Sequence, residues 1–398
     1  SRIWYNRAAD RWDALVPRND EVNNRSGGVS ASDHYLMTDI VGDRAFTTVE
    51  LEDRDWARPD AFWDEGAGTL HVLSSHPDDV EFWRLRHDRI DDRYVIEVGT
   101  PGAGVVVPGM THPARRLGGD SPATVHVAPN GSVWAAVMAG DGLLVQHSSD
   151  GGASWLLQPV VVDDGAGRGV TTWIDIETDD GIAVGLFAGE NGRRSVDTDF
   201  LFWRIAQDAD PTVAGNWVDE RDRIPQSFGV EQSDDHVSAA ADADGNRYFA
   251  VKTEGGDPND PLIKLYRRDR TGNWSQYEVT ATSDVPEQSR PSIVIDTQRE
   301  AISIYVNGAE VAGNNERVAG RFTAPLDAPE RLAEAPFVPL FAEAGVIFTD
   351  LITPRWPVTG DQGVVVLAHN RTDRTVWFST DDPEQGALPL TIPPDGDS

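Results

Sequence analysis

Short runs of apolar residues alternate with polar turns along the whole chain, and the runs come in pairs. In each pair, two apolar runs flank a turn rich in Asp, Asn or Gly, which is the pattern of a β-hairpin. The pairs comprise residues 58–64 with 70–73, 121–127 with 133–137, 172–176 with 182–186, 236–240 with 248–251 and 290–296 with 302–306, and residues 355–369 form a looser sixth. The pattern predicts a repeated unit of short strands.

A third apolar run follows most of these pairs and ends in a polar corner. The third runs are residues 82–88, 144–150, 200–204, 263–269 and 376–381. A hairpin, a third strand and a closing fourth strand make one blade of a β-propeller. Residues 1–17 and 45–51 supply a further blade, so we predict an all-β, seven-bladed propeller, with six or eight blades as alternatives. A pair of β-sandwiches would leave the recurring third run unexplained.

The rest of the chain adds little helix and no second domain. Residues 330–335 predict one helical turn, and residues 383–398, rich in Asp, Pro and Gly, predict a mobile tail. No apolar run has the roughly 20 residues needed to span a bilayer. We expect one domain over residues 1–398. The abrupt start at Ser1, without a signal peptide, is compatible with the loss of a leader or a neighbouring domain.

One corner has a distinctive sequence. Residues 148–155 read Ser-x-Asp-x-Gly-x-x-Trp, in which Asp150 and the glycines suit a tight turn and Trp155 can pack beneath it. Residues 269–274 keep the Asp and the Trp but have Thr271 in place of the Gly. The motif resembles the Asp-box, or bacterial neuraminidase repeat, of sialidases, polysaccharide lyases and secreted glycan-binding proteins, and residues 234–253 resemble secreted bacterial propellers of this group.

This resemblance implies a propeller fold, an extracellular location and a carbohydrate ligand. In that group the Asp-box is a structural corner away from the active face, so it implies nothing about which residues bind the ligand. Sialidases of the group use three arginines on one carboxylate with a Tyr and Glu pair, and we find no such pair here. Lyases of the ulvan type use His, Tyr and Arg.

The charge of the chain is strongly acidic. It holds 34 Lys and Arg against 66 Asp and Glu, a net charge of −32, and Lys252 and Lys264 are its only lysines. Such a surface repels nucleic acid and anionic membranes. It suits either a protein from a high-salt environment or an acidic secreted protein from a GC-rich genome. The absence of Cys excludes disulfides and thiolate metal sites.

Arginines stand where the inner strands of the predicted propeller begin. These strands surround one axis, so their first residues converge on one face. The positions hold Arg58, Asp120, Thr171, Asp235 with His236, Arg290 and Arg355. Since a guanidinium binds carboxylate or sulfate through two parallel hydrogen bonds, the arginines predict an acidic glycan as ligand. The alternative is that they pair with neighbouring Asp residues and hold the blades together.

Catalysis would need a base beside a cation. His236 follows two carboxylates that can orient its imidazole, and Arg290 or Arg355 can stabilise the enolate formed in uronate elimination. The candidates are His236, Arg290 and Arg355 as catalytic residues and Arg58, Asp120, Asp235, Trp173 and Trp356 as substrate-binding residues. The alternatives are that His236 caps a turn and that the two tryptophans belong to the core.

The sequence predicts no metal centre and no cofactor. No histidines have metal-binding spacing, and the acidic turns at 163–165 and 242–245, which could hold structural Ca²⁺, do not match an EF-hand. We therefore predict a secreted or cell-surface propeller that acts on an acidic oligo- or polysaccharide by uronate β-elimination or glycoside hydrolysis. The alternatives are a non-catalytic glycan-binding or adhesion module and a scaffold for protein partners. Its oligomeric state is not predicted.

Overall fold

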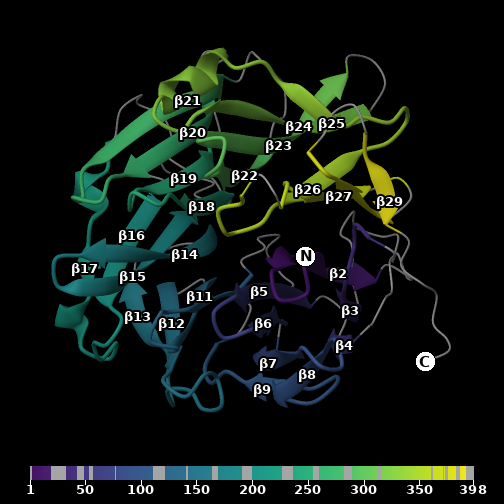
Figure 1. Cartoon of the computed structure of the whole chain (residues 1–398). Coiled ribbons are helices and arrows are strands. Elements are labelled where there is room, and N and C mark those ends of the chain that lie inside the picture. Colours follow the sequence, from purple (N-terminus) through teal and green to yellow (C-terminus); the bar gives the residue numbers. More distant parts are fainter. Residues whose placement is uncertain are drawn as a thin grey trace.

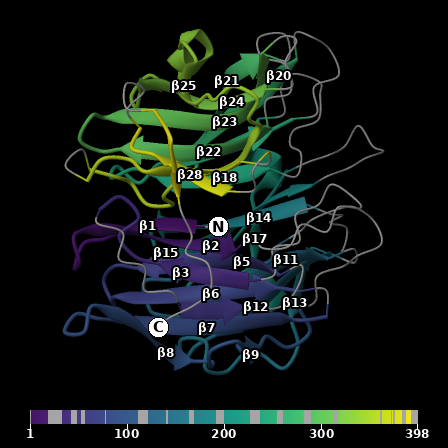
Figure 2. The same ribbon diagram turned by 90° about the vertical axis from the view of Figure 1, so that its right-hand side faces the viewer.

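The chain folds into seven sheets around a central axis. The computed structural model describes residues 2–18, 33–42, 49–52, 57–76, 78–110, 122–139, 142–163, 169–190, 200–225, 236–253, 260–281, 289–311, 316–359, 362–370, 372, 375–381 and 386–390. Each sheet is an antiparallel meander in sequence order, and Figure 1 shows the seven arranged as blades of a propeller. The predicted fold class and blade number are confirmed. In Figure 2 the disc is seen from its edge, so that the strands run across the view.

The blades follow one another along the chain. Blade 1 consists of β1 (Arg2–Asn6), β2 (Arg11–Arg18), β3 (Asp33–Met37) and β4 (Val49–Glu52); blade 2 of β5 (Arg58–Asp64), β6 (Thr69–Ser75), β7 (Val80–Asp88) and β8 (Arg93–Val98), with β9 (Val105–Val106) paired to β7; and blade 3 of β10 (Thr124–Val127), β11 (Val133–Ala139), β12 (Gly142–Ser148) and β13 (Val160–Asp163).

Blade 4 consists of β14 (Gly169–Thr178), β15 (Gly181–Glu190), β16 (Phe200–Ala206) and β17 (Val218–Asp219); blade 5 of β18 (Val237–Ala241), β19 (Arg247–Lys252), β20 (Pro261–Arg268) and β21 (Trp274–Ala281); blade 6 of β22 (Ser289–Asp296), β23 (Ala301–Val311), β24 (Glu316–Pro325) and β25 (Val338–Phe341); and blade 7 of β26 (Phe348–Ile352), β27 (Val366–Asn370), β28 (Thr375–Ser379) and β29 (Leu388–Leu390).

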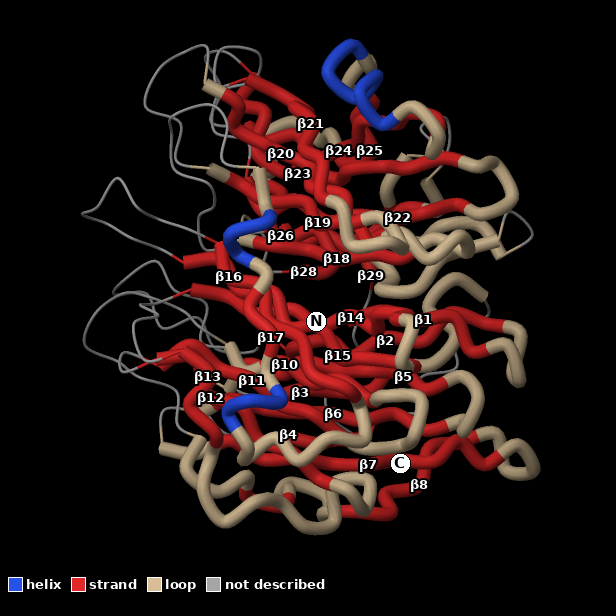
Figure 3. Tube along the Cα trace, turned by 90° about the vertical axis from the view of Figure 1, so that its left-hand side faces the viewer, coloured by secondary structure: helices blue, strands red, loops and turns tan. Residues whose placement is uncertain are grey.

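In the residues that the structure describes, helix is confined to short 3₁₀ turns, the blue segments of Figure 3: η1 (Ala214–Asn216), η2 (Arg221–Arg223) and η3 (Pro329–Glu334). The last of these matches the helical turn predicted at 330–335. Within the described part of the chain, none of them has the length or the apolar character to cross a bilayer.

The last blade differs from its prediction in two ways. Its inner strand begins at Phe348 rather than at Arg355, which lies beyond the end of β26 at Ile352. Residues 388–390 form its outermost strand, paired with β28, and so belong to the sheet rather than to a loose tail. The remainder of the predicted tail, at 383–385 and 391–398, lies outside the described residues.

Apolar side chains fill the seams between neighbouring blades. Five clusters of buried residues lie between blades 1 and 2, 2 and 3, 3 and 4, 4 and 5, and 5 and 6, and a sixth extends across blades 6, 7 and 1. The first and last blades are each built from one continuous segment, so that in the described residues no strand crosses from one to the other. The ring therefore closes through side-chain packing, together with a 3.2 Å hydrogen bond from Trp12 Nε1 to the Gln362 carbonyl.

Buried polar groups also join the blades. Glu220, which follows β17 in blade 4, is fully buried and accepts hydrogen bonds from Arg268 Nε at 2.9 Å and Trp274 Nε1 at 3.3 Å, both from blade 5. Tyr94 of blade 2 donates to the buried Asp13 of blade 1 at 2.8 Å. These hydrogen bonds join neighbouring blades. They also give the buried carboxylates of Glu220 and Asp13 the hydrogen-bond partners that buried polar groups need.

The corner at residues 148–155 is a tight polar turn. Asp150 accepts hydrogen bonds from the Ser154 backbone N–H and from Ser148 Oγ, both at 2.8 Å, and its interactions with Ser154 lower its pKa to about 2. Gly152, at φ +90°, sits against the Phe82 ring of blade 2. Trp155 packs edge-on against Phe82, with ring centroids 5.3 Å apart. The corner thus anchors blade 3 to blade 2.

Candidate functional site

Two arginines and one aspartate meet at the propeller axis. We call the face at which the inner strands β1, β5, β10, β14, β18, β22 and β26 begin the top face, and the opposite face the bottom face. Arg2, the first residue of β1, forms an ion pair with Asp60 of β5. Arg355 donates to the second oxygen of Asp60, with Nη2 and Oδ2 3.2 Å apart. We call Arg2, Asp60 and Arg355 the axial cluster.

Arg355 reaches the axial cluster from blade 7, on the other side of blade 1. It belongs to blade 7, yet besides Asp60 in blade 2 it contacts blade 3, where Nη1 donates to the Val125 carbonyl at 3.0 Å. The neighbouring Trp356 also reaches blade 2, donating to the Trp63 carbonyl at 3.1 Å and packing edge-on against Phe62. Residues 353–357 therefore join blade 7 to blades 2 and 3 near the axis.

Hydroxyl groups continue the polar layer around the axis. Thr124 of β10 and Thr171 of β14 share a 2.6 Å hydrogen bond, and Ser292 of β22 and Thr353 share one of 2.5 Å. Ser238 of β18 accepts from the Ile293 backbone N–H at 3.2 Å. Because each contact joins two neighbouring blades, the inner strands hold these groups in fixed positions.

The axial cluster carries a net positive charge. Burial works to raise the pKa of Asp60, but the charges of Arg2 and Arg355 outweigh it and the pKa is lowered, so the group is a carboxylate at neutral pH. Burial lowers the pKa of Arg355, while the negative charge of Asp60 acts in the opposite direction and favours the charged guanidinium. The side chains of Arg2 and Arg355 remain 34% and 21% exposed, against 2% for Asp60. The guanidiniums thus surround a buried anion and still reach solvent.

Two histidines and a further arginine lie near each other at the top-face ends of their strands. His369, in β27, has its pKa lowered to about 3, mainly by burial, then by the charge of the terminal amine and last by that of Arg290 at the start of β22. His34, in β3, is buried, and its pKa is lowered by burial and by the proximity of His369. Both imidazoles are therefore neutral at pH 7, and His369 lies near the permanent cation of Arg290.

The remaining predicted site residues occupy different environments. Arg58 opens β5 and is half-buried, and His236 is half-buried directly before β18, with its carbonyl accepting the Lys252 N–H at 3.2 Å. Trp173 lies in the core between blades 3 and 4, 5% exposed and donating to the Thr124 carbonyl at 3.3 Å, as the packing alternative predicts. Trp356 is 39% exposed. Asp120 and Asp235 lie outside the described residues.

Sequence reasoning missed three residues of this region. Arg2 occupies the same position in β1 as Arg58 does in β5, so the rule that selected Arg58 would have selected it too. Asp60 shares a strand face with Arg58, two residues on, but a single Asp in a strand carries no signal of its own. His369 was passed over because it has no metal-binding spacing, and only the approach of blade 6 to blade 7 brings Arg290 to it.

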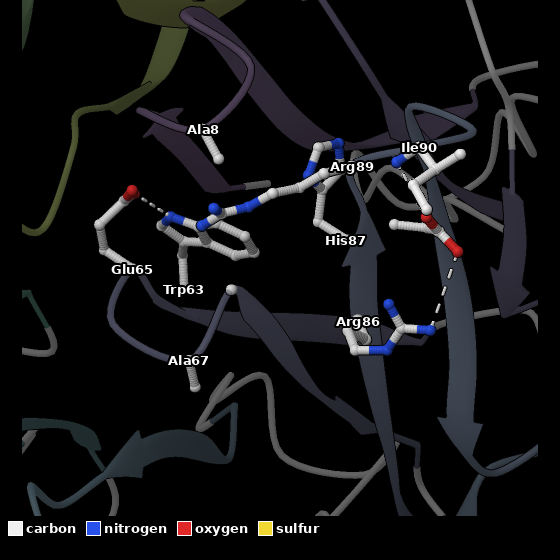
Figure 4. A pocket seen from close by; sticks show the side chains of 10 residues that line it. Ala8, Trp63, Glu65, Ala67, Arg86, His87, Arg89 and Ile90 are labelled. Carbon is white, nitrogen blue, oxygen red and sulfur yellow. Dashed lines mark hydrogen bonds and ion pairs between the residues drawn. The ribbon is translucent and has the colours of Figure 1, made fainter.

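A depression opens on the bottom face between blades 1 and 2, and Figure 4 shows the side chains that line it. They come from the ends of β5 and β7 and from the turns after β1, β5 and β7, and include Trp63, Glu65, Arg86 and His87. These groups are already paired: Trp63 donates to Glu65 at 2.6 Å, Arg86 to Glu97 at 2.9 Å, and His87 lies 3.1 Å from Asp92. These polar groups are therefore bonded to one another or to neighbouring side chains.

Among the described residues, no three His, Asp or Glu side chains are grouped to hold a metal ion. Of the acidic turns considered for Ca²⁺, Asp242 uses its carboxylate within its own hairpin, accepting from the Asn246 N–H at 2.8 Å and the Tyr248 hydroxyl at 2.9 Å. Asp163 forms an ion pair with Arg221. Asp164 and Gly165 lie outside the described residues.

Comparison with known proteins gives fold-level likenesses. No family model matches the chain, and no curated protein sequence matches it. Among solved structures, an α-L-arabinanase of Penicillium chrysogenum with bound arabinobiose is 14% identical, with a TM-score of 0.48 over 67% of this chain and 79% of its own. A variant of the Aleuria aurantia lectin with α-methyl-L-fucoside is 10% identical, with a TM-score of 0.45 over 86% and 96%.

A third similar structure is PorZ, a bacterial surface component of the type-IX secretion system of Porphyromonas gingivalis. It is 11% identical, with a TM-score of 0.49 over 96% of this chain and 45% of its own. At these identities and scores, the three likenesses carry no inference about ligand or activity.

Proposed function

We propose that this propeller binds an acidic glycan at the axial cluster. The observation that carries the proposal is the pair of partly exposed guanidiniums, Arg2 and Arg355, held by one buried carboxylate, Asp60. Arg2 and Arg355 bring two positive charges, and Asp60 one negative charge, to the axis of a protein whose net charge is −32. A carboxylate or sulfate group is the ligand that such a site favours, because guanidinium N–H groups bind these anions with charge-assisted hydrogen bonds.

The surroundings of the cluster suit a sugar better than a bare ion. Hydroxyl groups such as Thr124, Thr171 and Ser292 lie in the same layer of the inner strands. Asp60 holds both guanidiniums in place before the ligand arrives, so that little side-chain entropy is lost on binding. On this account the protein is an extracellular or cell-surface glycan-binding propeller, with its ligand approaching the axis from the top face.

Cleavage of the glycan is the second candidate function, and the neutral His369 beside Arg290 favours it. Uronate β-elimination requires a base that removes the proton from C5 and a cation that stabilises the resulting enolate. A guanidinium can supply that charge. His369, with its pKa lowered to about 3, is the weaker of two candidate bases, and His236, at the start of blade 5, is the other.

The binding proposal is tested with a panel of acidic and neutral oligosaccharides on the wild-type protein and on Arg2→Gln. We expect acidic members to bind, neutral members not to bind, and Arg2→Gln to weaken binding by about tenfold or more, since it removes a hydrogen bond to a charged group. Arg86→Gln, in the bottom-face depression, is the matched control and should bind normally. Equal binding of Arg2→Gln and the wild type would contradict the proposal.

The same panel separates binding from cleavage. Elimination produces an unsaturated uronate that absorbs in the ultraviolet, and hydrolysis produces new reducing ends without that absorbance. Binding with neither product would identify a non-catalytic module. A product that disappears in His369→Gln but persists in His236→Gln would assign the base.

A further inference from the structure

Arg290 has an unusual backbone conformation for its place in the fold. Six non-glycine residues of the described chain have positive φ; four of them are Asp, and Glu300 closes the turn between β22 and β23. Arg290, at φ +56°, is the sixth and lies within a strand. An Arg in the left-handed region is strained, because its Cβ crowds the backbone, and such strain is kept where a side chain must be aimed.

The strain coincides with a bulge at the top-face end of blade 6. The pairing of β22 with β23 shifts between Ser289 and Ser292, so Arg290 and Pro291 stand out of the regular ladder. Bulges re-aim side chains and are common beside binding sites. The Arg290 side chain is exposed, and its strand continues directly to Ser292, which contacts Thr353 in the layer of the axial cluster.

Arg290 also has a specific electrostatic neighbour. Its charge acts on His369 of blade 7, which is neutral at pH 7. Because this imidazole is neutral, it does not repel a cation or an anion beside it, and it can add a hydrogen bond to a ligand held near Arg290.

We infer that Arg290 is a second anion-binding position of the axial site, and that the ligand is an oligosaccharide with acidic groups on more than one sugar. This inference rests on the proposed function. The axial cluster takes one acidic group, and Arg290, placed further toward the top face, takes an acidic group of another sugar in the same chain. A ligand with a single acidic sugar would occupy only one of the two positions.

The test uses Arg290→Gly, because glycine adopts the observed φ without strain while removing the guanidinium. Binding of oligouronates of one to four residues, in the galacturonic, glucuronic and mannuronic series, is measured by calorimetry on the wild type and the variant. Glu300→Gly is the matched control, since it also relieves a positive φ but lies on the bottom face. Both variants should melt at the wild-type temperature or about 2 °C above it.

We expect wild-type affinity to rise by tenfold or more between the monouronate and a longer member of at least one series. In Arg290→Gly the monouronate should bind as in the wild type, while the gain with length should be lost, and Glu300→Gly should retain it. Equal wild-type affinity for all lengths, or a gain with length that survives in Arg290→Gly, would overturn the inference and leave the proposed function standing. Failure of the wild type to bind any uronate would overturn the inference, and failure to bind any member of the acidic panel would overturn the proposed function as well.

Discussion

Arg355 in the last blade donates to Asp60 in the second blade across the propeller axis, with 3.2 Å between Nη2 and Oδ2. The contact skips blade 1, whose own Arg2 binds the other oxygen of the same carboxylate. One buried Asp therefore joins three segments that are far apart in the sequence. It also fixes two guanidiniums near the axis, so the same contact serves the fold and the proposed ligand.

Asp60→Asn should separate these two roles. Removal of the carboxylate charge leaves two guanidiniums uncompensated, which should destabilise the fold by about 3–5 kcal/mol. The same change should strengthen binding of an acidic glycan, because Asp60 no longer competes with the ligand for Arg2 and Arg355. Chemical denaturation and calorimetry on the same preparation measure the two effects. A variant that is less stable and also binds more weakly would show that Asp60 contributes to binding chiefly by positioning the arginines.

Gly152→Ala tests the corner that anchors blade 3 to blade 2. A methyl group there would overlap the Phe82 ring, at a backbone φ of +90° that alanine avoids, so we expect a loss of about 3 kcal/mol or more. Gly68→Ala is the control: its φ is +64°, but nothing lies within 4 Å of the added methyl, and about 1 kcal/mol should be lost. If the two variants lost equal stability in urea denaturation, the overlap with Phe82 would add nothing to the cost of the substitution at Gly152.

Trp12 tests how the ring closes. It lies in the cluster that joins blades 6, 7 and 1, so Trp12→Ala should lower the free energy of unfolding by about 3–5 kcal/mol. Trp12→Phe, which keeps the ring but loses the bond to the Gln362 carbonyl, should cost about 1 kcal/mol in hydrogen bonding, besides some packing. Ile90→Ala, at a position 94% exposed, should change stability by less than about 0.5 kcal/mol. A small effect of Trp12→Ala would place the closure of the ring elsewhere.

His71 should make the fold sensitive to mild acid. Burial lowers the pKa of His71 to about 3, whereas in the unfolded chain it has its ordinary value of about 6.5. Between these values the unfolded state binds more protons, so this contribution to stability falls as the pH drops below about 6.5, by about 2 kcal/mol at pH 5. His71→Phe should lose correspondingly less stability between pH 7.5 and pH 5 in urea titrations. An unchanged pH dependence would mean that His71 is not held neutral.

The sequence predicted the blades well because each depends on local pattern. Paired apolar runs around polar turns located six inner hairpins, and five of them match the strands closely. The last blade was misplaced because residues 353–358, which contain Pro354 and Pro357, continue inward from β26 and pair with Asp296 of blade 6 through Val358. Periodicity cannot distinguish such a segment from an inner strand.

The candidate site could be predicted only in part, because it depends on contacts between blades. The rule that inner strands begin around one axis selected Arg58 and Arg290, and the same rule applies to Arg2. It could not show that Arg355 crosses the axis to Asp60, nor that His369 comes within reach of Arg290's charge. Packing between neighbouring blades likewise determines that Trp173 is buried while Trp356 remains 39% exposed.

The most direct test of the central claim is a crystal structure of the protein with an acidic oligosaccharide that it binds. We predict that a carboxylate or sulfate of the ligand lies within hydrogen-bonding distance of both Arg2 and Arg355, on the top-face side of Asp60. A ligand found instead in the bottom-face depression beside Trp63 and His87, with the axial guanidiniums untouched, would contradict it.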